Sequence, residues 1–218
     1  MKIAVIGASG YVGGAIAAEA IARGHDVTAI SRSSSNLPPS PKLHPVALDV
    51  HETAQLAEAL RGHDAVIHAF NPGRGRTDPD IFDLFVAGHR AIIEAVQQAG
   101  VTRLLCVGGA GSLKTKDGVA LLDSPEWPKE FDIYKDGILA TRELYYILQK
   151  TDGIDWVYLS PPSMLLPGER TGSYRLGTDQ LLYSADGRSW ISVADYAVAM
   201  TDELEKPAHH RERFTVGY

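Results

Sequence analysis

The chain has 218 residues, of which 44% are hydrophobic and 22% are charged, and its formal net charge is −6. These values are ordinary for globular proteins and argue against disordered and fibrous classes. The negative charge, with Lys and Arg scattered along the chain, argues against nucleic acid as a partner. We expect a single domain over 1–218, cytoplasmic by default and without a membrane partner, because no stretch has the length of a membrane span and no signal-peptide pattern is present.

Strand-like and helix-like segments alternate along most of the chain. A short apolar strand at 3–6 is followed by an Ala-rich helix at 11–23 and a strand at 26–31. The segment 33–45 is crowded with Ser and Pro, and we interpret it as a surface loop without regular structure. The alternation continues with strands at 46–48, 65–69, 103–107 and 156–159 and helices at 53–60, 81–98 and 138–149. It predicts an α/β fold in which helices cover both faces of a doubly wound parallel sheet.

The pattern changes after Pro161-Pro162, where glycine-rich, polar turns replace the regular alternation. A helix is predicted at 193–205 and a last strand at 214–216. We interpret the intervening segment, mainly 162–190, as a small C-terminal cap that binds substrate.

The first predicted strand runs directly into Gly7-Ala8-Ser9-Gly10-Tyr11-Val12-Gly13, which opens the first helix. Gly7 permits a tight turn, Gly10 lets the backbone approach a phosphate, and Gly13 lets the helix pack close to the sheet. Backbone N–H groups and the positive end of the helix dipole then favour an anion at this point. Strand, turn and helix in this order predict a Rossmann fold with a dinucleotide cofactor.

The end of the second strand normally selects between the two nicotinamide cofactors. An acidic residue there binds a free ribose hydroxyl, whereas an arginine suits a 2′-phosphate. The chain has Ser31-Arg32-Ser33 at this point, so we expect NADP(H) to be preferred, with NAD(H) as the alternative. The alternative is that Arg32 is a surface arginine exposed to solvent and without a ligand, which the sequence alone does not distinguish.

Ligands of open parallel sheets bind beyond the carboxyl ends of the strands. Asp49-Val50 ends the third strand and Ala69-Phe70-Asn71 ends the fourth, so we place both segments at the cofactor. Asp49 has two interpretations of equal weight, a bond to the adenine amino group or a cap for the helix that begins near Thr53.

These motifs resemble the atypical short-chain dehydrogenase/reductases, in particular the NmrA-like and NAD(P)H-flavin reductase group related to biliverdin reductase B. The resemblance covers almost the whole chain. It rests on the glycine turn and on three further stretches, which are Val107-Gly108-Gly109-Ala110-Gly111-Ser112, Asp155-Trp156 with Ser160-Pro161-Pro162, and Gly168–Gly172 with 191–197. It implies that Gly108 and Gly109 lie at the cofactor and that Pro161, Pro162 and Ser163 line its nicotinamide end.

Short-chain dehydrogenases usually carry a catalytic tyrosine, a lysine four residues later and a serine after the fifth strand. The resemblance puts Tyr134 on the tyrosine position, Ser112 on the serine position and Ile138 on the lysine position. Lys135 is no substitute, because one residue turns about 100° around a helix while four residues return to the same face. Tyr134 and Ser112 are therefore the catalytic candidates of an incomplete set, each with a structural alternative, packing for Tyr134 and local capping for Ser112.

Three functions are compatible with this set. The first is an NADP(H)-dependent reductase that passes hydride directly to a flavin- or quinone-like acceptor, which needs no strong side-chain acid. The second is an NmrA-like redox sensor that binds NADP(H) without turnover. The third, a sugar-nucleotide epimerase or dehydratase, is less favoured because such enzymes resemble the complete set. The histidines do not share the spacing of metal ligands, so we expect no metal site. We expect the protein to be a monomer or a homodimer.

Overall fold

A computed structural model describes residues 1–33, 38–73 and 75–218 of the protein. The strands are β1 (Lys2–Ile6), β2 (Asp26–Ser31), β3 (Leu43–Ala47), β4 (Ala65–His68), β5 (Arg103–Val107), β6 (Asp155–Ser160), β7 (Met164–Leu166), β8 (Arg175–Gly177), β9 (Trp190–Ser192) and β10 (Glu212–Gly217). The helices are α1 (Tyr11–Ala22), α2 (Thr53–Leu60), α3 (Ile81–Ala99), α4 (Lys135–Gln149) and α5 (Val193–Glu205). Short 3₁₀ turns at Ala110–Ser112, Leu121–Asp123 and Lys129–Tyr134 connect β5 with α4.

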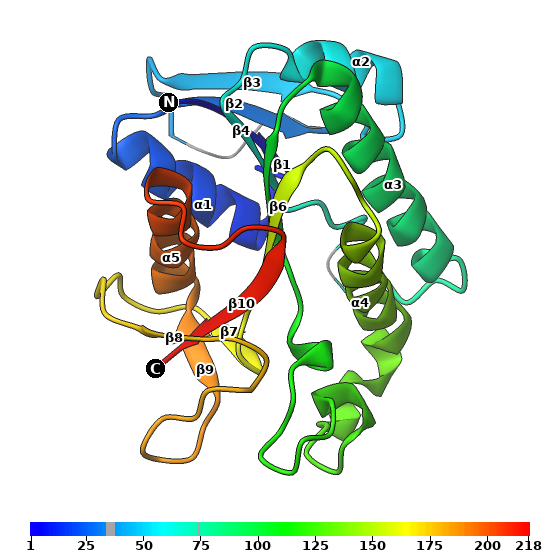
Figure 1. The fold of residues 1–218 in the computed structure, drawn as a ribbon, viewed down its shortest axis with the longest axis vertical. Coiled ribbons are helices and arrows are strands. Elements are labelled where there is room, and N and C mark those ends of the chain that lie inside the picture. The colour runs from blue at the N-terminus through cyan, green and yellow to red at the C-terminus, as the bar shows by residue number, and fades with distance from the viewer. Residues whose placement is uncertain (34–37, 74) are drawn as a thin grey trace.

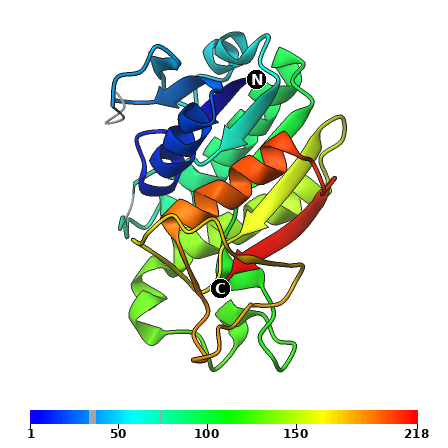
Figure 2. The same cartoon turned by 90° about the vertical axis from the view of Figure 1, so that its left-hand side faces the viewer.

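The main sheet has the strand order β3-β2-β1-β4-β5-β6-β10-β8. All neighbouring pairs are parallel except β10 with β8, and β7 pairs with β9 in a separate parallel ribbon. Helices α1 and α5 cover one face, and α2, α3 and α4 cover the other (Figure 1). The view toward the first face shows α5 beside α1 in front of the strands (Figure 2). This is the predicted doubly wound Rossmann fold.

Each central strand supplies both halves of the core, because successive side chains point to opposite faces of a sheet. Ile3 and Val5 pack among α1 and α5, whereas Ala4 and Ile6 pack among α2 and α3. These four residues are fully buried. Burial on both faces explains why the strands are continuous apolar runs rather than alternating ones.

The position of the site follows from the strand order. β1 lies between β2 and β4, and the chain continues outward from these two strands in opposite directions. The loops that follow β1 and β4 therefore diverge and leave a crevice at the carboxyl edge of the sheet, which is where open α/β sheets bind ligands.

The prediction of a loop over 33–45 was wrong at its end, because β3 begins at Leu43 and contains Pro45. Residues 34–37 of that loop lie outside the described residues. β3 is the edge strand, and Leu48 donates its N–H to the carbonyl of Ser31. Backbone N–H groups alternate in direction along a strand, and Pro45 lies three residues before Leu48, so the nitrogen of Pro45 faces away from β2. On that open side of an edge strand the missing N–H costs no hydrogen bond of the sheet.

The segment 162–190 is tied to the rest of the fold. β8 extends the main sheet beside β10, and the N–H groups of Thr171 and Gly172 donate to the buried carboxylate of Asp195, at 2.9 and 2.7 Å. That this segment covers a substrate stays a prediction. No helix in the described ranges is long and apolar enough to cross a membrane.

Candidate dinucleotide site and adjoining pocket

Crowded backbone explains two glycines of the turn after β1. Gly7 has φ +85°, and a Cβ atom there would lie 2.3 Å from the carbonyl oxygen of Ala69. A Cβ atom at Gly13 would lie 2.3 Å from the carbonyl oxygen of Gly7. Both contacts are far below any real Cβ distance, so only glycine fits at these two positions.

Gly10 has a different reason to be glycine. Its φ of −82° is accessible to any residue, and a Cβ atom there would approach only the carbonyl oxygen of Gly7, at 3.1 Å. Gly10 is the N-cap of α1, where no side-chain cap and no acidic first-turn residue is present in this fully described helix. The positive end of the helix dipole is thus open to an anion.

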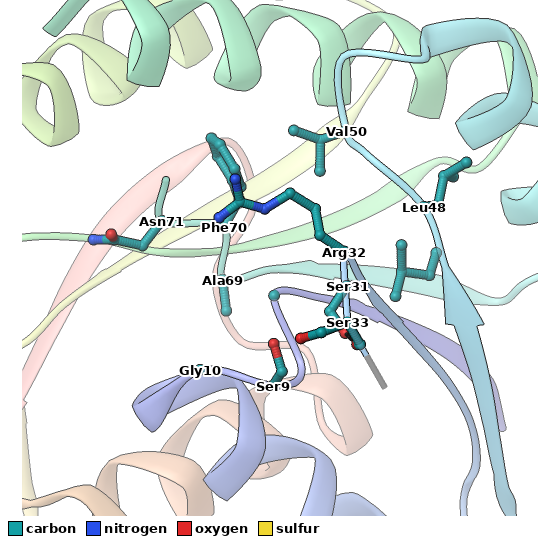
Figure 3. A pocket seen from close by; sticks show the side chains of 12 residues that line it. Ser9, Gly10, Ser31, Arg32, Ser33, Leu48, Val50, Ala69, Phe70 and Asn71 are labelled. Atoms are coloured by element: carbon teal, nitrogen blue, oxygen red, sulfur yellow. Dashed lines mark hydrogen bonds between the residues drawn. The ribbon is translucent and has the colours of Figure 1, made fainter. Parts of the chain in front are cut away.

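The first of three adjoining cavities, the Arg32 pocket, has a volume of about 130 Å³. It is lined by the glycine turn and by the ends of β2, β3 and β4 (Figure 3). The Arg32 side chain reaches across this pocket toward Phe70, and its Nη2 donates to the carbonyl oxygen of Pro72 at 2.9 Å. Among the described residues this neutral carbonyl is its one hydrogen-bond partner, so the guanidinium charge can still meet an anionic ligand.

Asp49 lies beside this pocket without lining it, whereas Val50 lines it. The Asp49 carboxylate accepts from the backbone N–H of His51 at 3.0 Å and pairs with its Nδ1 at 2.7 Å. These bonds, with a smaller contribution from Arg32, lower the pKa of Asp49. The helix-cap interpretation was wrong, because Glu52 is the N-cap of α2 and this end has no side-chain cap hydrogen bond.

The second cavity, the central groove, has a volume of about 450 Å³. It shares the turn, Arg32 and 69–71 with the Arg32 pocket and extends past Gly108 to Thr141, Pro161 and Leu165. Together the two cavities are lined by fourteen of the predicted cofactor residues, which are Gly7, Ser9, Gly10, Tyr11, Val12, Gly13, Ser31, Arg32, Val50, Ala69, Phe70, Asn71, Gly108 and Pro161. The predicted residues Asp49, Gly109, Pro162 and Ser163 line neither.

Two buried histidines support the loop after β4. The Phe70 N–H donates to Nδ1 of His68 at 3.3 Å, and burial lowers the pKa of His68 to about 3. The neutral ring must then carry its proton on Nε2, which donates to Nδ1 of His89 at 2.9 Å. Burial and the nearby His68 also lower the pKa of His89. Its Nε2, buried and without a partner in the described part of the chain, carries the last proton.

The third cavity, the Tyr134 pocket, has a volume of about 380 Å³ and shares Asn71, Gly73, Phe85 and Thr141 with the central groove. Tyr134 and Ile138 both line it and Lys135 does not, as expected from helix geometry. Ser112 lines none of the three cavities, and its hydroxyl accepts from Nη1 of Arg213 at 2.8 Å. The structure therefore places only Tyr134 of the two catalytic candidates in this chain of cavities.

The chain matches the family described as NAD(P)H-binding over residues 7–204. It is 44% identical to the uncharacterized Bacillus subtilis protein YwnB, over 99% of this chain and 98% of that protein. It is similar to a crystal structure from Bacteroides thetaiotaomicron named "putative epimerase", with 45% identity, TM-score 0.90 and coverage of 100% and 96%. It is also similar to a Streptococcus pneumoniae structure named "putative NADH-flavin reductase", with 36% identity, TM-score 0.83 and coverage of 100% and 99%. The chain belongs to the NAD(P)H-binding family.

Proposed function

We propose that the protein is an NADP(H)-dependent reductase in which hydride passes directly to a flavin- or quinone-like acceptor. The observation that carries the proposal is that the three cavities lie side by side and share lining residues. They run from a cation, Arg32, past the open end of α1 to an aromatic pocket at Tyr134. A dinucleotide and a second flat molecule can meet end to end in such a space.

The residues present fit a dinucleotide. The glycine turn would hold the pyrophosphate with backbone N–H groups, and Arg32 would hold a 2′-phosphate, which favours NADP(H) over NAD(H). NADPH, when bound, supplies the hydride. The protein supplies binding, orientation and exclusion of water.

The Tyr134 pocket suits a planar acceptor. Aromatic rings of Phe85, Phe131 and Tyr134 and the aliphatic side chain of Ile138 line it. Such walls offer stacking surfaces to a flat molecule. Since Ile138 stands where a lysine would assist a catalytic tyrosine, we assign Tyr134 to packing against the acceptor rather than to donating a proton.

The names of similar structures point to two chemistries. The Streptococcus pneumoniae structure, by its name, supports flavin reduction. The name of the Bacteroides thetaiotaomicron structure points to epimerisation, which the incomplete set at Tyr134 and Ile138 disfavours.

Steady-state oxidation of NADPH and of NADH tests the proposal, with a panel of riboflavin, flavin mononucleotide, menadione and sugar nucleotides. We expect turnover with flavins or quinones and a higher kcat/KM for NADPH. Turnover with sugar nucleotides alone would support an epimerase or dehydratase. Tight NADPH binding with no turnover of any compound would support a redox sensor.

A further inference from the structure

Tyr158 occupies the middle of β6 and is fully buried. Its hydroxyl joins two separate segments of the chain. It accepts from the N–H of Gly109, in the loop after β5, at 3.0 Å, and it donates to the carbonyl oxygen of Thr141, in α4, at 2.9 Å. One hydroxyl thus bridges a loop of the sheet and a helix of the covering layer.

The Tyr158 ring also supports the same loop. A Cβ atom at Gly108 would lie 2.4 Å from Cε1 of this ring, so the Gly108 backbone rests directly on it. On the other side, a Cβ atom at Gly109 would lie 3.1 Å from Cγ2 of Thr141. The Gly108-Gly109 backbone is therefore packed between Tyr158 and α4.

The two sides of this bridge belong to the walls of the site. Gly108 lines the central groove, and Thr141 lines both the central groove and the Tyr134 pocket. The Thr141 hydroxyl donates within its own helix, to the carbonyl oxygen of Gly137 at 3.0 Å. The connection between α4 and the loop after β5 thus runs through the backbone oxygen of Thr141 and the Tyr158 hydroxyl.

We propose that Tyr158 is a positioning residue that sets the separation between these two walls, and with it the fit of the acceptor beside the cofactor. This inference rests on the proposed function. Burial raises the pKa of Tyr158, so the hydroxyl keeps its proton, and the bond to Thr141 persists throughout the neutral range.

The test is Tyr158→Phe, which keeps the supporting ring and removes both hydrogen bonds. Calorimetry should give an NADP⁺ Kd within about twofold of wild type, because the glycine turn and Arg32 are unchanged and the ring that supports Gly108 remains. The Kd of oxidised riboflavin for the NADP⁺-bound protein should rise by about tenfold, because the wall at Thr141 is no longer tied to the loop at Gly109. In turnover the KM for the acceptor should rise more than the KM for NADPH.

Thr201→Val is the matched control. Thr201 is fully buried in α5 and donates to the carbonyl oxygen of Ala197 at 2.8 Å, away from the three cavities. Both variants should lower the melting temperature, but only Tyr158→Phe should weaken riboflavin binding. Unchanged riboflavin affinity in folded Tyr158→Phe, or equal weakening in both variants, would overturn the role of Tyr158. A wild-type protein that neither binds nor reduces any acceptor would instead refute the proposed function, and this inference with it.

Discussion

The two ends of the site are built differently. At the glycine turn, backbone atoms define the shape, and at Gly7 and Gly13 a single added Cβ atom would overlap a carbonyl oxygen. At the Tyr134 pocket, side chains from the loop after β4, from α3 and from the segment before and within α4 define the shape. Backbone geometry restricts the first end to a few residue types, whereas side chains can be exchanged at the second with little change of fold. We infer that the first end accounts for the family's cofactor and the second for the individual acceptor.

The largest expected effect is that of Gly10→Asp at the backbone-built end. The new carboxylate would occupy the phosphate path and repel the pyrophosphate, so NADPH affinity should fall by about a hundredfold or more. Calorimetric titration measures the NADPH affinity of the variant. Ala18→Asp, which puts the same charge on an exposed position of α1, should bind NADPH as wild type does. Equal affinity in folded Gly10→Asp would remove the phosphate-binding role from the turn.

The histidine pair beneath Phe70 should make stability depend on pH. His68 and His89 have lowered pKa values in the folded protein, whereas the unfolded chain gains protons below the ordinary value of 6.5. Full stability is therefore present above that pH and is lost as pH falls, with a slope that approaches about 1.4 kcal/mol per pH unit for each histidine well below pH 6.5.

Urea denaturation between pH 7 and pH 5 measures this slope. His89→Gln removes one titrating group and should give a shallower slope, with lower stability at pH 7 from the disturbed pair. A variant with the wild-type slope would show that His89 is not kept neutral by the fold.

Arg32→Asp sharpens the comparison within the cofactor end, where a side chain rather than the backbone is involved. Loss of a charge-assisted bond to a 2′-phosphate costs roughly 1.5 to 3 kcal/mol, or about one to two powers of ten in affinity. The dissociation constant of NADP divided by that of NAD should rise by this factor, so that the preference shifts toward NAD. Arg61→Asp, a charge reversal on the exposed surface at the end of α2, is the control. A constant ratio in Arg32→Asp would make Arg32 a surface residue without a role in cofactor choice.

Tyr134→Phe should have the smallest effect. The ring that lines the pocket remains and only a hydroxyl is lost, so single-turnover hydride transfer to the best acceptor should slow by less than about tenfold. A tyrosine that acts as general acid would instead lose about two to four powers of ten. A hundredfold loss at neutral pH would therefore contradict direct transfer.

The residues around the glycine turn could be placed from the sequence more fully than those around the Tyr134 pocket, and the reason is physical. The glycine turn, Arg32 and 69–71 follow strands directly, so their places along the sheet edge follow from strand order. Ser112 and Tyr134 lie in the long connection between β5 and α4, where position depends on packing that no local pattern encodes. The contacts of Tyr158, His68 and His89 were missed because each of these residues lies within a regular strand or helix, where the sequence shows no motif. A polar side chain within an apolar run, as His68 is, was the one available signal.

The most direct test of the central claim is stopped-flow single turnover of NADPH and of 4-deuterated NADPH, with riboflavin and menadione as acceptors. We expect rapid NADPH oxidation with a primary deuterium isotope effect for at least one acceptor, and loss of this reaction in Gly10→Asp. Saturable NADPH binding without oxidation by any flavin or quinone would contradict it.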